Sequence, residues 1–154
     1  MERKYAEFAA TKACELLAID SPSGYTRKAA TWVKEAFEAL GFAAKITTKG
    51  GVLADLGGAD KDDALFLQAH TDTLGAMVAE IKANGRLKLT PLGGLRAENA
   101  ETENVRVHTR TGKIIEGTVQ LCNASVHVNG EYGETKRTFD TVEAVLDEDV
   151  KTAE

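Results

Sequence analysis

Apolar residues recur every three or four positions through residues 5–40, which is the spacing of amphipathic helices. The first stripe stops at the Ser-Pro-Ser-Gly sequence of residues 21–24, a strong turn signal. The second begins after Thr26, a suitable N-cap, and ends at Gly41, the usual residue for a left-handed C-cap. We therefore expect two helices before residue 42. Their apolar faces consist of Tyr5, Phe8, Ala9, Ala13, Leu16 and Leu17, and of Ala29, Val33, Ala36, Phe37 and Leu40.

After Gly41 the apolar spacing shortens to about two, which is the period of a β-strand. Short strands are expected at 44–48 and 52–56, and a third at 64–69. In the third, Leu65, Phe66 and Leu67 follow one another without a polar interruption. Such a run is typical of a strand that is buried on both faces of a sheet. Two helices covering this strand would form an α/β layer.

The rest of the chain is rich in strand signals, which makes the expected fold class α+β. Asn84-Gly85 and Thr111-Gly112 are turn sequences that favour hairpins. The acidic segment 93–104 between the two hairpins is interpreted first as a solvated loop and second as a functional one. We expect the paired strands at 76–81 with 86–90 and at 105–110 with 113–121, and a further strand at 142–146.

The end of the chain has the sequence expected where a helix begins. Asp147, Glu148 and Asp149 would favour the positive N-terminal end of a helix dipole, and they precede residues 150–154. The sequence ends where that helix would start, so we expect a truncated chain.

Composition narrows the class of protein. The chain has 154 residues, of which 43% are hydrophobic and 28% charged, enough for one ordinary globular domain or two small ones. The net charge of −5 and the dispersed basic residues argue against nucleic acid as a partner. No apolar run is long enough to span a membrane, and the N-terminal segment is too charged for a signal peptide. Cys14 and Cys122 lack metal or redox spacing, so we expect reduced thiols and a cytoplasmic location.

His70-Thr71-Asp72 is the strongest candidate for chemistry, because it follows the apolar run directly. Open α/β sheets bind ligands at the carboxyl ends of their strands, and alternate residues of an extended chain point the same way. Metal-bound imidazoles commonly donate their second N–H group to a carboxylate. His70 could therefore be a metal ligand with Asp72 as its orienting partner. The alternative is a purely structural His–Asp hydrogen bond, and three residues alone do not decide between the two.

The other polar candidates carry weaker signals. His108 lies in the alternating sequence VRVHTR, which favours a surface or cross-strand role. His127 lies in SVHV, after the second predicted hairpin, and nothing in the local sequence gives it a chemical partner. Ser21 and Ser23 have no histidine at a suitable spacing, so a nucleophilic serine is not expected.

Longer stretches resemble a known family. SPSGYTRKAATWVKEAFEALGF, KGGVLADLGG and LFLQAHTDTLGAMVAEIKANGRLKLTPLGG follow one another as in the N-terminal part of the family M42 metallo-aminopeptidases, the glutamyl and deblocking aminopeptidase group. The resemblance continues in order through ENVRVHTRTGKIIEGTVQ, SVHVNGE and VLDEDV. The passage from His70-Thr71-Asp72 to Gly75 and a β-rich insertion is similar to family M42 rather than to M20 or M28.

The resemblance implies a two-part organisation. Residues 1–73 would be the N-terminal part of an α/β zinc-peptidase catalytic domain. Residues 74–154 would be most of a β-barrel-like insertion domain of the dimerisation type, incomplete at its C-terminus. His70 matches the first metal ligand, and Asp72 matches the carboxylate that supports its ring. The resemblance implies two zinc or cobalt ions, with the other ligands and the catalytic glutamate located after the insertion. By analogy with zinc peptidases that borrow a histidine from a dimerisation domain, His127 could touch substrate in a neighbouring subunit.

The implied function is metal-dependent removal of N-terminal residues from peptides, by an enzyme that forms homo-oligomers through its β-rich domain. This chain alone would be inactive, because one histidine cannot hold two metal ions. The alternative is a non-catalytic binding or assembly module that associates with itself or with a full-length enzyme.

Overall fold

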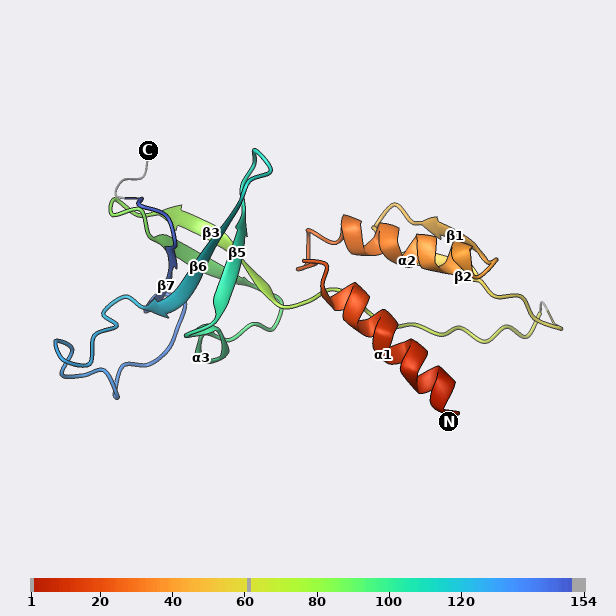
Figure 1. Cartoon of the computed structure of the whole chain (residues 1–154), viewed down its shortest axis with the longest axis horizontal. Helices are drawn as coiled ribbons and strands as arrows, with labels where there is room; N and C mark the ends of the chain where they lie inside the picture. Colours follow the sequence, from red (N-terminus) through yellow and green to blue (C-terminus); the bar gives the residue numbers. More distant parts are fainter. Residues whose placement is uncertain (1, 61, 151–154) are drawn as a thin grey trace. The chain divides into compact units, whose positions relative to one another are not determined.

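The structure is a computed structural model that describes residues 2–60 and 62–150. It divides into two compact units, Met1–Leu74 and Gly75–Glu154, and each is described by itself. Figure 1 shows helices with a small hairpin in the first unit and a β-sheet in the second. The elements of the first unit are α1 (Arg3–Leu17), α2 (Arg27–Ala39), β1 (Ala43–Ile46) and β2 (Val52–Asp55).

Helix α2 packs against the antiparallel β1–β2 hairpin and buries Ala29 and Ala30 (Figure 1). The helix and both strands were predicted and are confirmed. Gly41 has a φ of +89°, a left-handed conformation that L-residues with a Cβ rarely adopt, and it lies just past the helix end as expected. Thr26 occupies the N-cap position, but its side chain makes no capping hydrogen bond.

Helix α1 is also confirmed, but its apolar stripe is not buried. None of its residues is buried, and Tyr5, Phe8 and Leu17 are at least half exposed. Of the two helices, α2 makes the main contacts with the hairpin, so the apolar stripe of α1 stays in solvent. Surface ion pairs such as Arg3–Glu7 connect successive turns of this helix.

The strand expected at 64–69 is wrong for this structure. The segment is not assigned to a strand, and the side chains of Leu65, Phe66 and Leu67 are 84%, 72% and 75% exposed. A buried strand needs neighbours on both edges, and the sheet of this unit contains β1 and β2 only among its described residues. The expected α/β layer is therefore absent from the described part of the chain.

The second unit is a five-stranded antiparallel sheet with strand order β3-β4-β7-β6-β5. The predicted strands and both hairpin turns are confirmed, with Gly85 and Gly112 at positive φ in the turns. The sheet is curled in Figure 1, and the described pairing does not close it into a barrel. The strands are β3 (Gly75–Ile81), β4 (Leu87–Leu92), β5 (Asn104–His108), β6 (Ile114–Leu121) and β7 (Val142–Leu146).

One face of this sheet carries the core. Side chains two residues apart on β4, β6 and β7 point to the same side, and the short helix α3 (Ala97–Ala100) covers them. The solvated loop predicted at 93–104 is therefore wrong in part, because Ala97 and Ala100 are buried and Glu101 pairs with Arg137 at 2.8 Å. The buried cluster consists of Leu87, Leu89, Ala97, Ala100, Val119, Leu121, Val142 and Ala144.

Glu143 lies between two core residues of β7, so its side chain points to the opposite face. It is almost completely buried, and its two carboxylate oxygens accept hydrogen bonds from Lys82 at 2.6 Å and Arg86 at 2.5 Å. Burial raises the pKa of Glu143, but the hydrogen bonds from Lys82 and Arg86 outweigh burial and hold the pKa of the carboxyl below its usual value. This carboxylate links the β3–β4 turn region to β7.

The helix predicted at the end of the chain falls mainly on residues 151–154, which lie outside the described residues. Within 2–60 and 62–150, the helices are too short or too polar to cross a lipid bilayer.

We expect Glu143→Gln to lower the free energy of unfolding of the second unit by about 1–3 kcal/mol at pH 7, because the amide cannot compensate the two cations. Since the folded pKa is lowered, the carboxylate stabilises the fold above its usual pKa of 4.5, and this stabilisation is lost as pH falls through the folded pKa. Urea unfolding followed by circular dichroism at pH 7 and at pH 3–5 checks both points.

Glu148→Gln is the matched control. Glu148 pairs with Lys113 at 2.6 Å, but both side chains are about half exposed, so the change should cost less than about 0.5 kcal/mol. Equal effects of the two substitutions, or an unchanged acid dependence in Glu143→Gln, would contradict the stabilising role of the buried carboxylate.

Candidate functional site

The turn at residues 21–24 is bound to residues 71–73, about fifty positions later in the chain. The amide of Thr73 donates to the carbonyl of Ser21 at 3.0 Å, and Pro22 and Thr73 form an isolated parallel bridge. Ser21 is fully buried, and its hydroxyl donates to the carbonyl of Thr71 at 3.0 Å. Gly24 has a φ of +89°, which permits the turn that places Ser21 and Pro22 here.

This attachment brings Ser23, His70 and Asp72 together. Nδ1 of His70 lies 3.0 Å from Oδ1 of Asp72, and the Ser23 hydroxyl donates to Oδ2 of Asp72 at 2.8 Å. The hydrogen bonds from Ser23 and from His70 hold the pKa of Asp72 below its usual value. An ionised carboxylate opposite Nδ1 favours the tautomer that carries its proton on Nδ1. The His70 side chain is 86% exposed, which leaves Nε2 accessible.

The structure therefore brings His70 and Asp72 into contact, as alternation along an extended chain predicted. It does so without the strand that was expected to precede them. A metal ligand with its orienting carboxylate and a structural His–Asp pair both contain this hydrogen bond, so the role of each residue stays a prediction.

The pair fits one part of a metal centre. An imidazole that is hydrogen-bonded through Nδ1–H presents the lone pair of Nε2 to a metal ion, which is the arrangement found in many zinc sites. Within the described part of the chain, however, no group of three or more His, Cys, Asp or Glu side chains could hold a metal ion. These residues supply one oriented ligand, not a complete ligand set.

The other histidines lie in the second unit. His127 is exposed in the turn at residues 126–128, and Nδ2 of Asn129 bonds the carbonyl of Asn123 across this loop at 2.9 Å. His108 ends β5 and is partly buried. The predicted contact of His127 with a neighbouring subunit's substrate stays a prediction.

Ser23 is the site residue that sequence reasoning missed. Ser21 and Ser23 were considered only as nucleophiles, whereas both serve as hydrogen-bond donors to the segment that carries His70. The Ser-Pro-Ser-Gly composition indicates a turn rich in side-chain hydrogen bonds. The local sequence around Ser23 does not indicate that its hydrogen-bond partner is Asp72, some fifty residues later in the chain.

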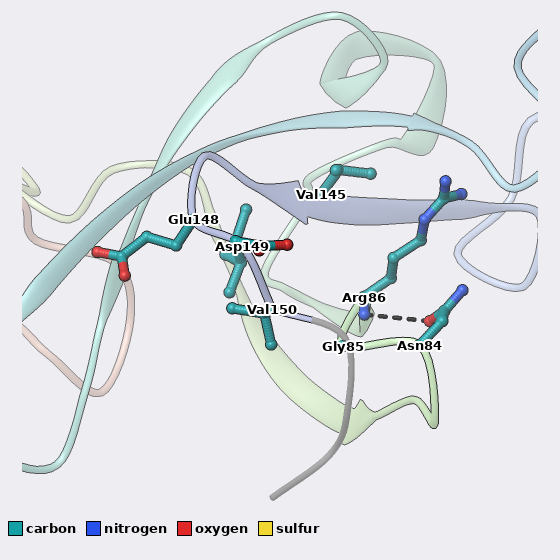
Figure 2. Close-up of a pocket in the computed structure, with 8 residues that line it drawn as sticks. Asn84, Gly85, Arg86, Val145, Glu148, Asp149 and Val150 are labelled. Atoms are coloured by element: carbon teal, nitrogen blue, oxygen red, sulfur yellow. Dashed lines mark hydrogen bonds between the residues drawn. The ribbon is translucent and has the colours of Figure 1, made fainter.

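Two hollows lie elsewhere. Figure 2 shows the smaller, of about 320 Å³, where the 84–86 turn faces residues 145–150. There the amide of Arg86 bonds Oδ1 of Asn84 at 3.1 Å, and a Cβ on Gly85 would lie 2.6 Å from Val150. The larger hollow, of about 1110 Å³, lies between α2 and the β1–β2 hairpin and includes Trp32. Neither contains His70 or Asp72.

Comparisons with known proteins identify relatives of this chain. A family model described as M42 glutamyl aminopeptidase matches residues 50–154. A Bacillus subtilis (strain 168) protein named "Putative aminopeptidase YhfE" is 39% identical over 136 residues, which are 88% of this chain and 39% of that protein. The glutamyl aminopeptidase of Lactococcus lactis subsp. cremoris (strain MG1363) is 29% identical over 101 residues, covering 65% of this chain and 28% of the relative.

The fold has a counterpart among solved structures. The TET aminopeptidase from the marine sediment archaeon Thaumarchaeota archaeon SCGC AB-539-E09 matches 94% of this chain and 40% of its own, with a TM-score of 0.72 and 22% identity. This likeness supports the mixed α and β fold. The chain spans about two fifths or less of the length of these relatives.

We expect Ser21→Ala to loosen the attachment of the segment that carries His70, because the Thr71 carbonyl loses its buried donor. The amide of Thr73 should then exchange with solvent about fivefold faster, the effect of losing one hydrogen bond of ordinary strength. Hydrogen exchange measured by NMR checks this, with Ser125→Ala in the second unit as the control. Unchanged protection of Thr73 would show that the Ser21 hydroxyl contributes nothing to the attachment.

Proposed function

The chain belongs to the M42 glutamyl aminopeptidase family, and from that premise we propose that it acts in the metal-dependent removal of N-terminal residues from peptides. The observation that carries the proposal is the His70–Asp72 pair, which is preorganised by Ser23 and exposes Nε2. In this proposal His70 is a metal ligand and Asp72 its orienting partner.

Each residue of the pair has a distinct task in this proposal. His70 would hold the metal through Nε2, while Asp72 accepts a hydrogen bond from Nδ1–H and keeps the ring in the required tautomer. Two bound divalent ions, zinc or cobalt, would activate water and polarise the scissile carbonyl. The remaining ligands and the general base would come from outside the described residues, because no further donors converge within them. The 154-residue chain alone is therefore proposed to be inactive.

The exposed run at Leu65, Phe66 and Leu67 supports the same proposal. It leads directly to His70, and three consecutive large apolar side chains are suited to the interior of a sheet. Strands supplied by further sequence or by another chain would bury this run and place more side chains beside His70.

A second role, self-assembly through the β-rich unit, is favoured by the end strand of its sheet. On β3, which has one unpaired edge in the described sheet, Met77, Val78 and Ile81 are exposed. Exposed apolar side chains on an edge strand are a usual feature of association surfaces. We propose a homo-oligomer that forms through this unit and acts on peptides. The free thiols of Cys14 and Cys122 agree with a cytoplasmic location.

We expect the 154-residue chain to bind Zn²⁺ or Co²⁺ only weakly, with one ligand per metal and no convergent set. Isothermal titration calorimetry of the chain measures this directly, and His70→Ala should abolish the residual binding. Two sites of sub-micromolar affinity per monomer would contradict the proposed incomplete ligand set.

The catalytic proposal is tested on a protein that joins this chain to the remaining length its relatives possess, assayed for release of N-terminal residues from peptides. His70→Ala should remove most activity and one metal ion, because water does not replace an imidazole ligand. Asp72→Asn should keep the fold and much of the metal but cost about 10–100-fold in affinity or activity, since the amide lacks the carboxylate charge.

The order of these two effects is the decisive result. If Asp72→Asn lost as much metal as His70→Ala, Asp72 would be a direct ligand. Full activity and two bound metal ions in both variants would overturn the proposed roles, and absence of peptide hydrolysis in the unsubstituted protein would overturn the proposed activity.

A further inference from the structure

We propose that Ser23 is a positioning residue for His70: acting through Asp72, its hydroxyl sets the tautomer and the orientation of the imidazole ring. The inference deepens the proposed function, because it rests on His70 presenting Nε2 as a metal ligand. Ser23 touches neither metal nor substrate in this scheme. Ser23 orients the Asp72 carboxylate, and the carboxylate orients the His70 ring.

The geometry of Asp72 carries the first step. Oδ1 faces Nδ1 of His70 at 3.0 Å, and Oδ2 accepts the Ser23 hydroxyl at 2.8 Å, so each oxygen has its own partner. The terminal torsion of an aspartate is broad, and a carboxylate bound through one oxygen can swing about it. Binding through both oxygens restricts that rotation and keeps Oδ1 opposite the ring.

The placement of Ser23 carries the second step. Ser23 belongs to the same turn as Ser21, which is fully buried. The Ser21 hydroxyl donates a hydrogen bond to the carbonyl of Thr71, and the Thr73 amide donates one to the carbonyl of Ser21. These bonds lie on both sides of Asp72 in sequence. The hydroxyl of Ser23 is therefore held at a defined place relative to Asp72 by contacts that do not involve Ser23 itself.

The chemistry of imidazole supplies the third step. A neutral histidine has one N–H donor and one acceptor nitrogen, and a group that accepts a hydrogen bond from one nitrogen leaves the lone pair on the other. With Asp72 Oδ1 opposite Nδ1, the lone pair is on the exposed Nε2. When the Asp72 carboxylate swings away, Nδ1 keeps only the backbone carbonyl of Asp72 at 3.3 Å as a partner, so the bias weakens and the other tautomer gains population.

The test uses the ¹⁵N-labelled 154-residue chain without metal or peptide, at about pH 8, where imidazoles are ordinarily neutral. Long-range ¹H–¹⁵N spectra give the ratio of the two tautomers of each histidine. In the unsubstituted chain His70 should carry its proton on Nδ1. Ser23→Ala should lower the ratio of Nδ1–H to Nε2–H by roughly threefold or more, as expected for the loss of one hydrogen bond.

Three variants frame the result. Asp72→Ala gives the tautomer ratio of His70 when the carboxylate is absent. In Ser23→Ala the tautomer ratio of His70 should shift toward that value. Ser23→Thr keeps a hydroxyl and should keep the ratio of the unsubstituted chain. Ser125→Ala, a serine substitution in the second unit, should leave His70 unchanged, and His108 and His127 report on the integrity of the fold in the same spectra.

Several results would overturn the inference. An unchanged ratio in Ser23→Ala would show that Asp72 needs no support from the hydroxyl, and an unchanged ratio in Asp72→Ala would remove the carboxylate from the mechanism. Altered signals of all three histidines in Ser23→Ala would assign the hydroxyl a role in folding instead. Because the spectra need neither metal nor hydrolysis, an inactive enzyme would leave a positive result for Ser23 standing.

Discussion

The hydrogen bonds between residues 21–23 and 71–73 are the constraint on which the surroundings of His70 depend. In the segment that leads to His70, the described residues from Leu56 onward make no strand pairing until the bridge at Thr73. A chain of that length without other attachments would lose considerable conformational entropy on ordering. The bonds made by the buried Ser21 therefore define where His70 lies, and the turn that forms the first helix boundary also organises the candidate site.

The same segment shows how an apolar sequence depends on its neighbours. Leu65, Phe66 and Leu67 have the composition of a buried strand, yet they are exposed because backbone pairing requires strands on either side. The helix α1 has a related property, since its apolar stripe is also exposed. Both features agree with a unit whose apolar surfaces are suited to further elements, and they support the proposal, made from the incomplete ligand set, that the full metal site needs more than these residues.

The β-rich unit differs in that its core is complete on one face and its buried charge is compensated on the other. Val119, Val142 and Ala144 are almost wholly excluded from solvent, and the short helix α3 covers them. Glu143 is stabilised by two cations from β3–β4, which converts a costly buried carboxylate into a link between distant strands. The exposed residues of β3 lie outside this buried cluster.

The sequence by itself determined the helices α1 and α2, the hairpins and the alternation that places His70 beside Asp72, because each depends on residues only a few positions apart. It also carried the family resemblance, since that lies in the order of short motifs. Only the tertiary structure decided that the 65–67 run is exposed, that Ala97 and Ala100 are buried, and that Ser23 bonds Asp72. The physical reason is that burial and long-range hydrogen bonds depend on which distant segment is available as a partner, and no local pattern of residues encodes that.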